Sequence, residues 1–144
     1  MIKAILLIAA VAAIMTAPVA AQQGGYIVIV NDANVVSALS TEEVSKIFFK
    51  KAQRWSNGVD VVAVDQPENA AVREAFSVAV HGKSVGAVRA YWQQQIFSGR
   101  AVPPAERPSD EQVVAFVRST PGAIGYVSAG ATLAPGVRRL QIVR

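Results

Sequence analysis

Apolar positions along the chain fall into short unbroken runs and into stripes with helical spacing. The run YIVIV at 26–30 is continuous and rich in β-branched residues, which predicts a strand buried on both faces. The segment STEEVSKIFFK at 40–50 opens with a capping box and places its apolar residues on one helical face. A second apolar run at 59–64 follows an Asn-Gly turn. We expect these segments to form a βαβ unit whose two strands pair in parallel.

The rest of the chain is predicted to be mainly helical. One helix carries Val72, Phe76 and Val80, a second carries Val88 and Trp92, and HGKS at 81–84 separates them. A loop rich in Gly and Pro at 97–108 precedes a helix at 109–120, which opens with a second capping box from Ser109 to Gln112. A strand at 121–127 and a last strand at 139–143 complete the chain. The pattern predicts an α/β domain with a central, mostly parallel sheet of about four to five strands flanked by about four helices.

The N-terminal segment 1–21 has the pattern of a secretory signal peptide. Lys3 precedes an apolar run at 4–15, and the segment ends in small residues. We expect cleavage before Gln22, leaving residues 22–144 as one exported domain in the periplasm that is not embedded in a membrane. The alternative is a permanent N-terminal anchor, for which the apolar run is short. The absence of cysteine excludes a lipid-anchored lipoprotein and a disulfide framework.

Composition and residue types exclude several function classes. The chain has 14 Lys and Arg against 10 Asp and Glu, with no basic run longer than two residues, so we predict no nucleic-acid partner. His81 is the only histidine and precedes Gly82, a pattern typical of a helix C-terminus. With one histidine and no cysteine, no metal site of the usual ligand type is expected. No serine lies in a G-x-S-x-G context, so we predict no catalytic residue and no cofactor.

Several motifs in order resemble a known family. They are IF at 47–48, Trp55, Gly58 and GAIGYV at 122–127. Together they resemble one lobe of the periplasmic phosphate-binding proteins of ABC transporters, and most closely the short exported proteins described as phosphate transporter substrate-binding-like. The resemblance implies a single lobe of the type II periplasmic binding-protein (PBP-like) fold and a non-enzymatic role in recognising a small oxyanion such as phosphate. It also implies a membrane transporter or sensor as partner.

The sequence departs from the family at the turn that holds the ligand. Aligned from Phe76, the family's ligand arginine is replaced by Gln66, and its Ser, Gly and Thr are replaced by the residues at 70–72, which are Ala, Ala and Val. In addition, the chain is long enough for only one of the two lobes between which the family traps its anion. The ligand-binding geometry that the family uses is therefore not retained.

The same stretch, VDQPENAAVREAF at 64–76, places carboxylates where an anion would dock. Asp65 and Glu68 form a D-x-x-E pattern, which predicts that the following helix caps itself. A second anion there would meet repulsion of about 1 kcal/mol or more. Three residues remain as candidate ligands for an anion: Gln66, Asn69 and Arg73. For Arg73 the alternatives are an ion pair with Asp65 or Glu68, or a solvated position.

Two functions follow as hypotheses. The first is an exported substrate-binding-like protein that recognises a small oxyanion at the carboxyl edge of the sheet. The alternative is a periplasmic interaction or accessory module that has lost small-ligand binding and contacts a transporter or sensor. We predict that Tyr91, Trp92 and Phe97 are core residues, and that the glycines of GAIGY serve tight packing rather than approach to a ligand.

Overall fold

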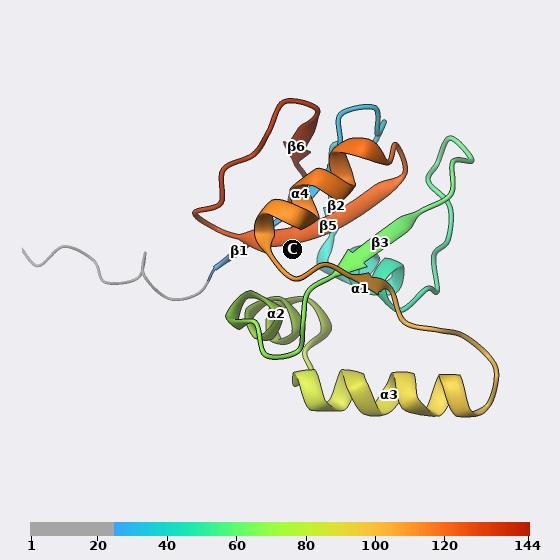
Figure 1. The fold of residues 1–144 in the computed structure, drawn as a ribbon. Coiled ribbons are helices and arrows are strands. Elements are labelled where there is room, and N and C mark those ends of the chain that lie inside the picture. The colour runs from blue at the N-terminus through green and yellow to red at the C-terminus, as the bar shows by residue number, and fades with distance from the viewer. Residues whose placement is uncertain (1–24) are drawn as a thin grey trace, which may run out of the picture.

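The computed structural model describes residues 25–144 as a three-layer α/β domain (Figure 1). The expected signal peptide at 1–21 lies outside these residues. The central sheet has five strands in the order β4-β3-β5-β1-β6. Their bounds are β1 Tyr26–Asn31, β3 Val62–Asp65, β4 Ala105–Glu106, β5 Ala123–Ser128 and β6 Val137–Arg139. Four strands run in one direction and β1 runs against them, because β3 is parallel to β4 and β5 whereas β1 is antiparallel to β5 and β6. The predicted fold class, α/β with a mostly parallel sheet, is confirmed.

The predicted parallel pairing of the first two strands is wrong. Strand β5 lies between β1 and β3, and it pairs antiparallel with β1 from Tyr26↔Ser128 to Val30↔Ile124. Helices bury both faces of β1, as its apolar pattern predicts, and its two neighbours in the sheet are strands from the C-terminal part of the chain. Periodicity specifies burial but not strand direction, and the expected βαβ unit does not form.

A second, two-stranded sheet pairs β2 (Ala38–Ser40) in parallel with β7 (Gln141–Val143). The single strand expected at 139–143 is therefore divided at Leu140 into β6 and β7. Leu140 is 1% exposed, and its N–H donates to the carbonyl of Val28 at 2.8 Å. This residue is the last contact with β1 before the chain turns away into the small sheet.

The bounds of the helices are α1 Thr41–Phe48, α2 Ala71–Phe76, the π-helix η2 Ser77–His81, α3 Val85–Phe97 and α4 Asp110–Ser119. Two helices, α1 and α4, begin at the caps that the sequence predicts, and the cap predicted at Asp65 is discussed below. The capping box of Ser40 and Glu43 starts α1, and Ser109 accepts a hydrogen bond from the N–H of Gln112 at the start of α4. The prediction that Gly82 ends a helix is confirmed, since it caps η2 with φ 62°.

Two hydrophobic clusters lie on opposite faces of the sheet. On one face, α1 and α2 pack Phe48 and Phe76 against Tyr126, and the rings of Phe76 and Tyr126 stack with centroids 3.8 Å apart. On the other face, α4 packs Val113 and Val117 against β1 and β5. Successive residues of β1 enter the two clusters alternately, as strand geometry requires.

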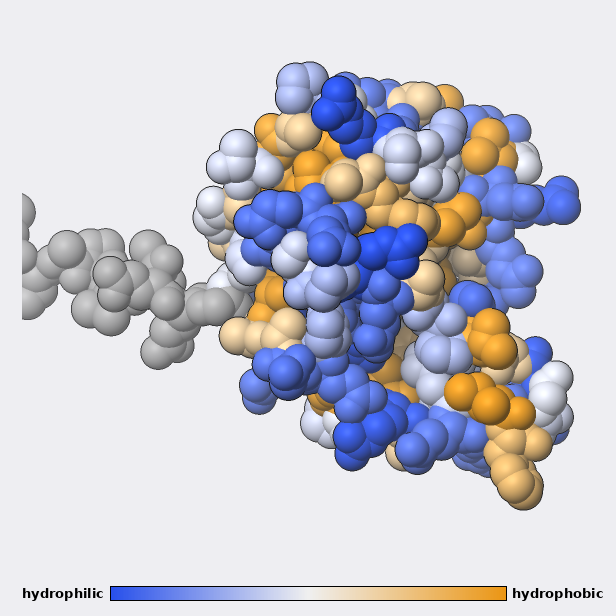
Figure 2. All heavy atoms as spheres, in the orientation of Figure 1, coloured by the Kyte–Doolittle hydropathy of each residue, from blue (hydrophilic) through white to orange (hydrophobic). Residues whose placement is uncertain are grey.

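Helix α3 projects from the domain and is attached through only part of its length (Figure 1). Trp92 is 5% exposed, as predicted, and Tyr91 is partly buried beside Phe49. The prediction that Phe97 is a core residue is wrong, because this side chain is 94% exposed. The helical stripe is correct for the middle of α3, but its last turn extends beyond the body it packs on. Hydrophobic spheres gather over this end of α3 in Figure 2.

Candidate functional site

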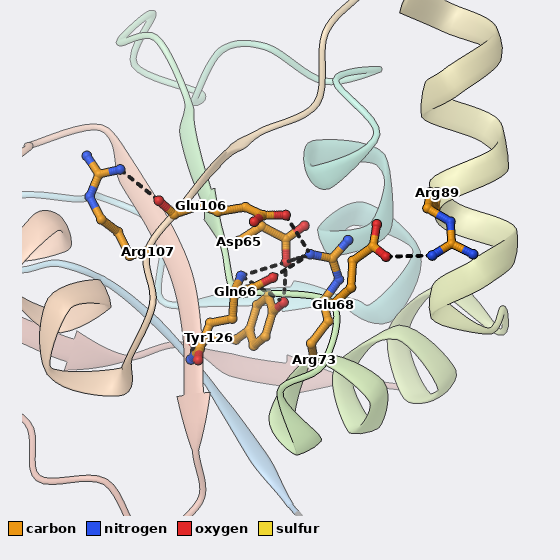
Figure 3. A network of polar contacts seen from close by, with 8 residues as sticks. All are labelled: Asp65, Gln66, Glu68, Arg73, Arg89, Glu106, Arg107 and Tyr126. Carbon is orange, nitrogen blue, oxygen red and sulfur yellow. Dashed lines mark hydrogen bonds and ion pairs between the residues drawn. The ribbon is translucent and has the colours of Figure 1, made fainter.

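A buried polar cluster lies at the carboxyl ends of β3 and β5, the edge where open α/β sheets place ligands. We call it the Asp65–Arg73 cluster; it comprises Asp65, Gln66, Arg73 and Tyr126, and its four side chains converge in Figure 3. Strand β3 ends at Asp65, β5 contributes Tyr126, and α2 brings Arg73 back over the end of β3. These residues range from position 65 to position 126 of the sequence, but they lie next to one another at one edge of the sheet.

Asp65 is held by three donors. Its side chain is 9% exposed, and its Oδ1 lies 2.9 Å from Nη1 of Arg73. The same oxygen accepts hydrogen bonds from the backbone N–H of Gln66 at 3.0 Å and from the hydroxyl of Tyr126. One carboxylate oxygen of Asp65 therefore makes all three contacts, and its charge is paired within the protein.

The predicted capping role of Asp65 and Glu68 is wrong. Helix α2 begins at Ala71, and its N-cap residue Ala70 offers no side-chain hydrogen bond. A turn closed by the N–H of Ala70 and the carbonyl of Pro67, at 3.0 Å, delays the start of the helix. Asp65 instead pairs with the buried guanidinium, a stronger partner than a helix amide. Glu68 pairs with Arg89 of α3 at 2.8 Å on the surface.

One nitrogen of the Arg73 guanidinium, Nη1, contacts three partners from the chain itself. Its side chain is 7% exposed, which excludes the solvated alternative. Nη1 donates to the carbonyl of Gln66 at 2.6 Å and lies 3.6 Å from Oε1 of Glu106, in addition to its contact with Asp65. Of the alternatives left open by the sequence, the ion pair with Asp65 is the one found.

Gln66 joins the ends of two strands to α4. Its Nε2 donates to Oδ1 of Asp110 at 2.8 Å and to the carbonyl of Tyr126 at 3.0 Å. The residue is 2% exposed. The structure therefore brings two predicted ligand residues, Gln66 and Arg73, into one cluster. Asn69 lies apart from them at an exposed position in the preceding turn.

Three carboxylates lie at this edge. Asp65 and Glu106 are within 4.0 Å of Arg73 and Asp110 accepts from Gln66, whereas the nearby Arg107 donates to the backbone carbonyl of Glu106. Burial raises the pKa of Asp65, and the charge of Arg73 and the hydroxyl of Tyr126 oppose that effect. Burial also raises the pKa of Tyr126, and the neighbouring Asp65 charge adds to the rise. Burial works against the ionised form of Asp110, but hydrogen bonds from Gln66 and Ser128 lower its pKa overall. An incoming anion would meet like charge at this edge.

Sequence reasoning missed Tyr126, Glu106 and Asp110 as members of this site. A signal for Tyr126 exists, since a tyrosine inside a buried strand needs a partner for its hydroxyl. Glu106 comes from β4, a two-residue strand within the segment predicted as a loop, and pairs beside Asp65 in parallel register. A strand as short as β4 has no recognisable pattern in the local sequence.

A separate polar contact joins Ser45 to His81. The Oγ of Ser45 lies 2.8 Å from Nδ1 of His81, whose ring packs against Phe49 and Phe76. Burial lowers the pKa of His81 to about 4, and the positive charges of Arg73 and Lys83 add to the effect. Within residues 25–144 no carboxylate hydrogen-bonds to this ring, so the third group of a catalytic triad is missing. The same residues contain no group of three or more His, Cys, Asp or Glu placed to hold a metal ion.

Replacing His81 by phenylalanine is expected to flatten the pH dependence of stability. A lowered folded-state pKa means that the unfolded chain binds a proton first as the pH falls from about 6.5 to about 4, so the wild-type protein loses stability across that window. For a partly exposed group the loss is about 2 kcal/mol. Urea unfolding at pH 7 and at pH 4.5 measures it. Carboxylates contribute alike to both proteins, so parallel profiles would contradict the assignment.

Comparison with known proteins identifies the family of this chain. A family model described as "PBP superfamily domain" matches residues 9–140. The chain belongs to this family. No curated protein matches it. The fold that the family model and the solved structures share is that of a substrate-binding protein, as the motifs from Ile47 to Val127 predict.

Solved structures share the fold of this PBP superfamily chain at low sequence identity. An ABC-type phosphate transport receptor from Vibrio cholerae has a TM-score of 0.65 and 18% identity, with 83% of this chain and 46% of that chain covered. A putative phosphate ABC transporter substrate-binding protein with bound phosphate from Clostridium perfringens has a TM-score of 0.65 and 19% identity. The match covers 83% of this chain and 45% of that chain. This chain thus spans less than half the length of either protein. Among residues 25–144, no helix is long and apolar enough to cross a membrane.

Proposed function

We propose that this PBP superfamily chain is an exported, non-enzymatic accessory protein that recognises another polypeptide and has no phosphate site of the family type. Its expected compartment is the periplasm, with a transporter or sensor as partner. The observation that carries the proposal is the ion pair between Arg73 and Asp65, in which the buried cation at the ligand edge is neutralised by the chain itself.

Three further features support the proposal. Gln66 stands at the position of the family's ligand arginine. Its side-chain amide donates hydrogen bonds to Asp110 and to the backbone carbonyl of Tyr126. Two additional carboxylates surround the cluster and disfavour an anion. The chain also covers less than half the length of each neighbour. The family resemblance implies an anion held between two lobes, of which these residues would supply one.

The second candidate is recognition of a small oxyanion at the same edge. It is favoured by the neighbour from Clostridium perfringens, whose structure contains bound phosphate. Binding in this way would require Arg73 to exchange Asp65 for the ligand, and the freed aspartate would then stay buried without a cation. Breaking such a pair costs about 3–5 kcal/mol, which an oxyanion contact would first have to offset.

A thermal-unfolding panel separates the two candidates. We expect phosphate, sulfate and related oxyanions at millimolar concentrations to leave the unfolding midpoint unchanged relative to chloride at equal ionic strength. A ligand present at a hundred times its dissociation constant would instead add about 2.7 kcal/mol and raise the midpoint by several degrees. The chloride control removes general salt effects on surface charges. A rise specific to phosphate would overturn the proposal and restore oxyanion recognition.

A further inference from the structure

A groove separate from the Asp65–Arg73 cluster runs beside the first half of β1. It has a volume of about 1020 Å³ and shares no residue with that cluster. Its floor is the start of β1, one wall is formed by β7 with Leu140, and the opposite wall by α2 and η2. The lining residues used below are Tyr26, Val28, Glu74, Val78, Arg139 and Arg144.

The groove exists because β1 has a strand neighbour on only one side at its beginning. Strand β5 pairs with β1 from Tyr26 onward, but β6 pairs with it only from Ile29 to Asn31. After the hydrogen bond from Leu140 to the carbonyl of Val28, the chain leaves β1 and pairs with β2 instead. Among the residues that the structure describes, β1 therefore has an open edge at its first two residues, Tyr26 and Ile27, and open edges accept an added strand.

The walls of the groove suit a polypeptide with both apolar and acidic residues. Val78 of η2 is 58% exposed although it is a large apolar side chain, and the partly buried Ile142 lines the same groove. Two cations, Arg139 and Arg144, border the groove, and neither has a carboxylate within 4.0 Å in the described part of the chain. Glu74 is the single acidic lining residue. The groove is thus apolar inside and mainly basic at its rim.

We propose that this groove binds an extended, acidic segment of a partner polypeptide, which adds to the sheet along the open edge of β1. Backbone hydrogen bonds to β1 would give affinity, alternate apolar side chains would contact Val78, and acidic side chains would meet Arg139 and Arg144. A second copy of the chain is the weaker fit, because two concave surfaces do not fill one another in a symmetric pair. The proposal rests on the proposed function and adds the binding surface and the chemistry of the partner.

The test begins with a displayed library of random peptides about ten residues long, the upper range of a strand. We expect selection on the folded protein to enrich peptides that alternate apolar residues with Asp or Glu. The best synthetic peptide is then titrated by fluorescence polarisation. Val78→Glu places a charge in the apolar wall and should weaken binding at least about tenfold. Arg139→Gln should weaken it several-fold and reduce its dependence on salt. Val102→Glu, a matched change at a residue that is 61% exposed and outside the groove, should have no effect.

Hydrogen exchange tests where the peptide binds. It should show new protection of the amides at the start of β1 when the peptide is bound. Failure to enrich peptides, or binding that both groove variants leave unchanged, would overturn the inference, as would a dimer that Val78→Glu dissociates. Arg139→Gln keeps the test valid if Val78→Glu does not fold. Phosphate is titrated on the same protein as a separate test. A response to phosphate would contradict the proposed function but not the groove, whereas peptide binding outside the groove would contradict only the inference about the groove.

Discussion

Replacing Arg73 by leucine is expected to lower the free energy of unfolding by about 3–5 kcal/mol, because it leaves a buried carboxylate without its cation. Asp65 and Arg73 are both nearly inaccessible to solvent, and their charged atoms are 2.9 Å apart. Leucine restores neither the charge nor the hydrogen bond to the carbonyl of Gln66. Urea unfolding at pH 7 measures the loss, and the double variant Asp65→Asn with Arg73→Leu should recover part of it.

The matched control is Arg89→Leu, which removes an ion pair of similar length at the surface. Arg89 lies 2.8 Å from Glu68, but its side chain is 55% exposed, so the change should cost less than about 1 kcal/mol. The pH dependence gives a second criterion. Without Arg73 the pKa of Asp65 rises further, so the loss in the Arg73→Leu variant should shrink as the pH falls towards 4. Equal losses for both arginines would show that the cluster is not an electrostatic unit.

Replacing Gly122 by alanine is expected to lower the free energy of unfolding by about 3 kcal/mol, the upper end of the range for overpacking. A Cβ at this position would lie 2.0 Å from the backbone oxygen of Asp60, which cannot move without displacing the chain that leads into β3. The carbonyl of Gly122 also accepts hydrogen bonds from the N–H of Val62 and from Nε1 of Trp55, both at 3.0 Å. Any shift that relieves the contact weakens these bonds.

Gly130→Ala provides the control for this change. A Cβ there meets no atom within 4 Å, so the substitution should change stability by no more than a few tenths of a kcal/mol. Thermal or urea unfolding of the two variants compares them directly. If Gly122→Ala were as stable as Gly130→Ala, the glycine would not be needed for packing, and its role in GAIGY would have to be sought in ligand approach instead.

The fold was predictable wherever burial and caps determine it. Ser40 and Ser109 start their helices as predicted, and the strand at GAIGYV is buried because its residues face both hydrophobic clusters. The neighbours of β1 were not predictable. A run of apolar residues indicates that a strand is buried in the middle of a sheet, but it does not indicate which strands pair with it. The same reason explains Phe97, since a helical stripe does not tell where the supporting body ends.

The candidate site was predictable in its location but not in its internal bonding. The sequence predicts the end of a strand near Asp65 with carboxylates beside it, and the structure has both features. It suggests a capping role, because a D-x-x-E pattern before a helix normally caps it. The actual partners of Asp65 depend on tertiary structure, since Tyr126 approaches from a strand 61 residues away in sequence. Buried charge overrides the local pattern here because an unpaired carboxylate in the interior is far more costly than a missing cap.

The antiparallel placement of β1 also constrains how the domain can fold. Its pairing joins Tyr26 to Ser128, so the middle of the sheet brings together residues from the two ends of the described chain. Such distant pairing closes a large loop before it gains stabilising contacts, which slows folding. A chain emerging from the ribosome cannot complete its central strands until β5 has been synthesised. If the protein is exported as proposed, this delay would leave time for translocation before the sheet closes.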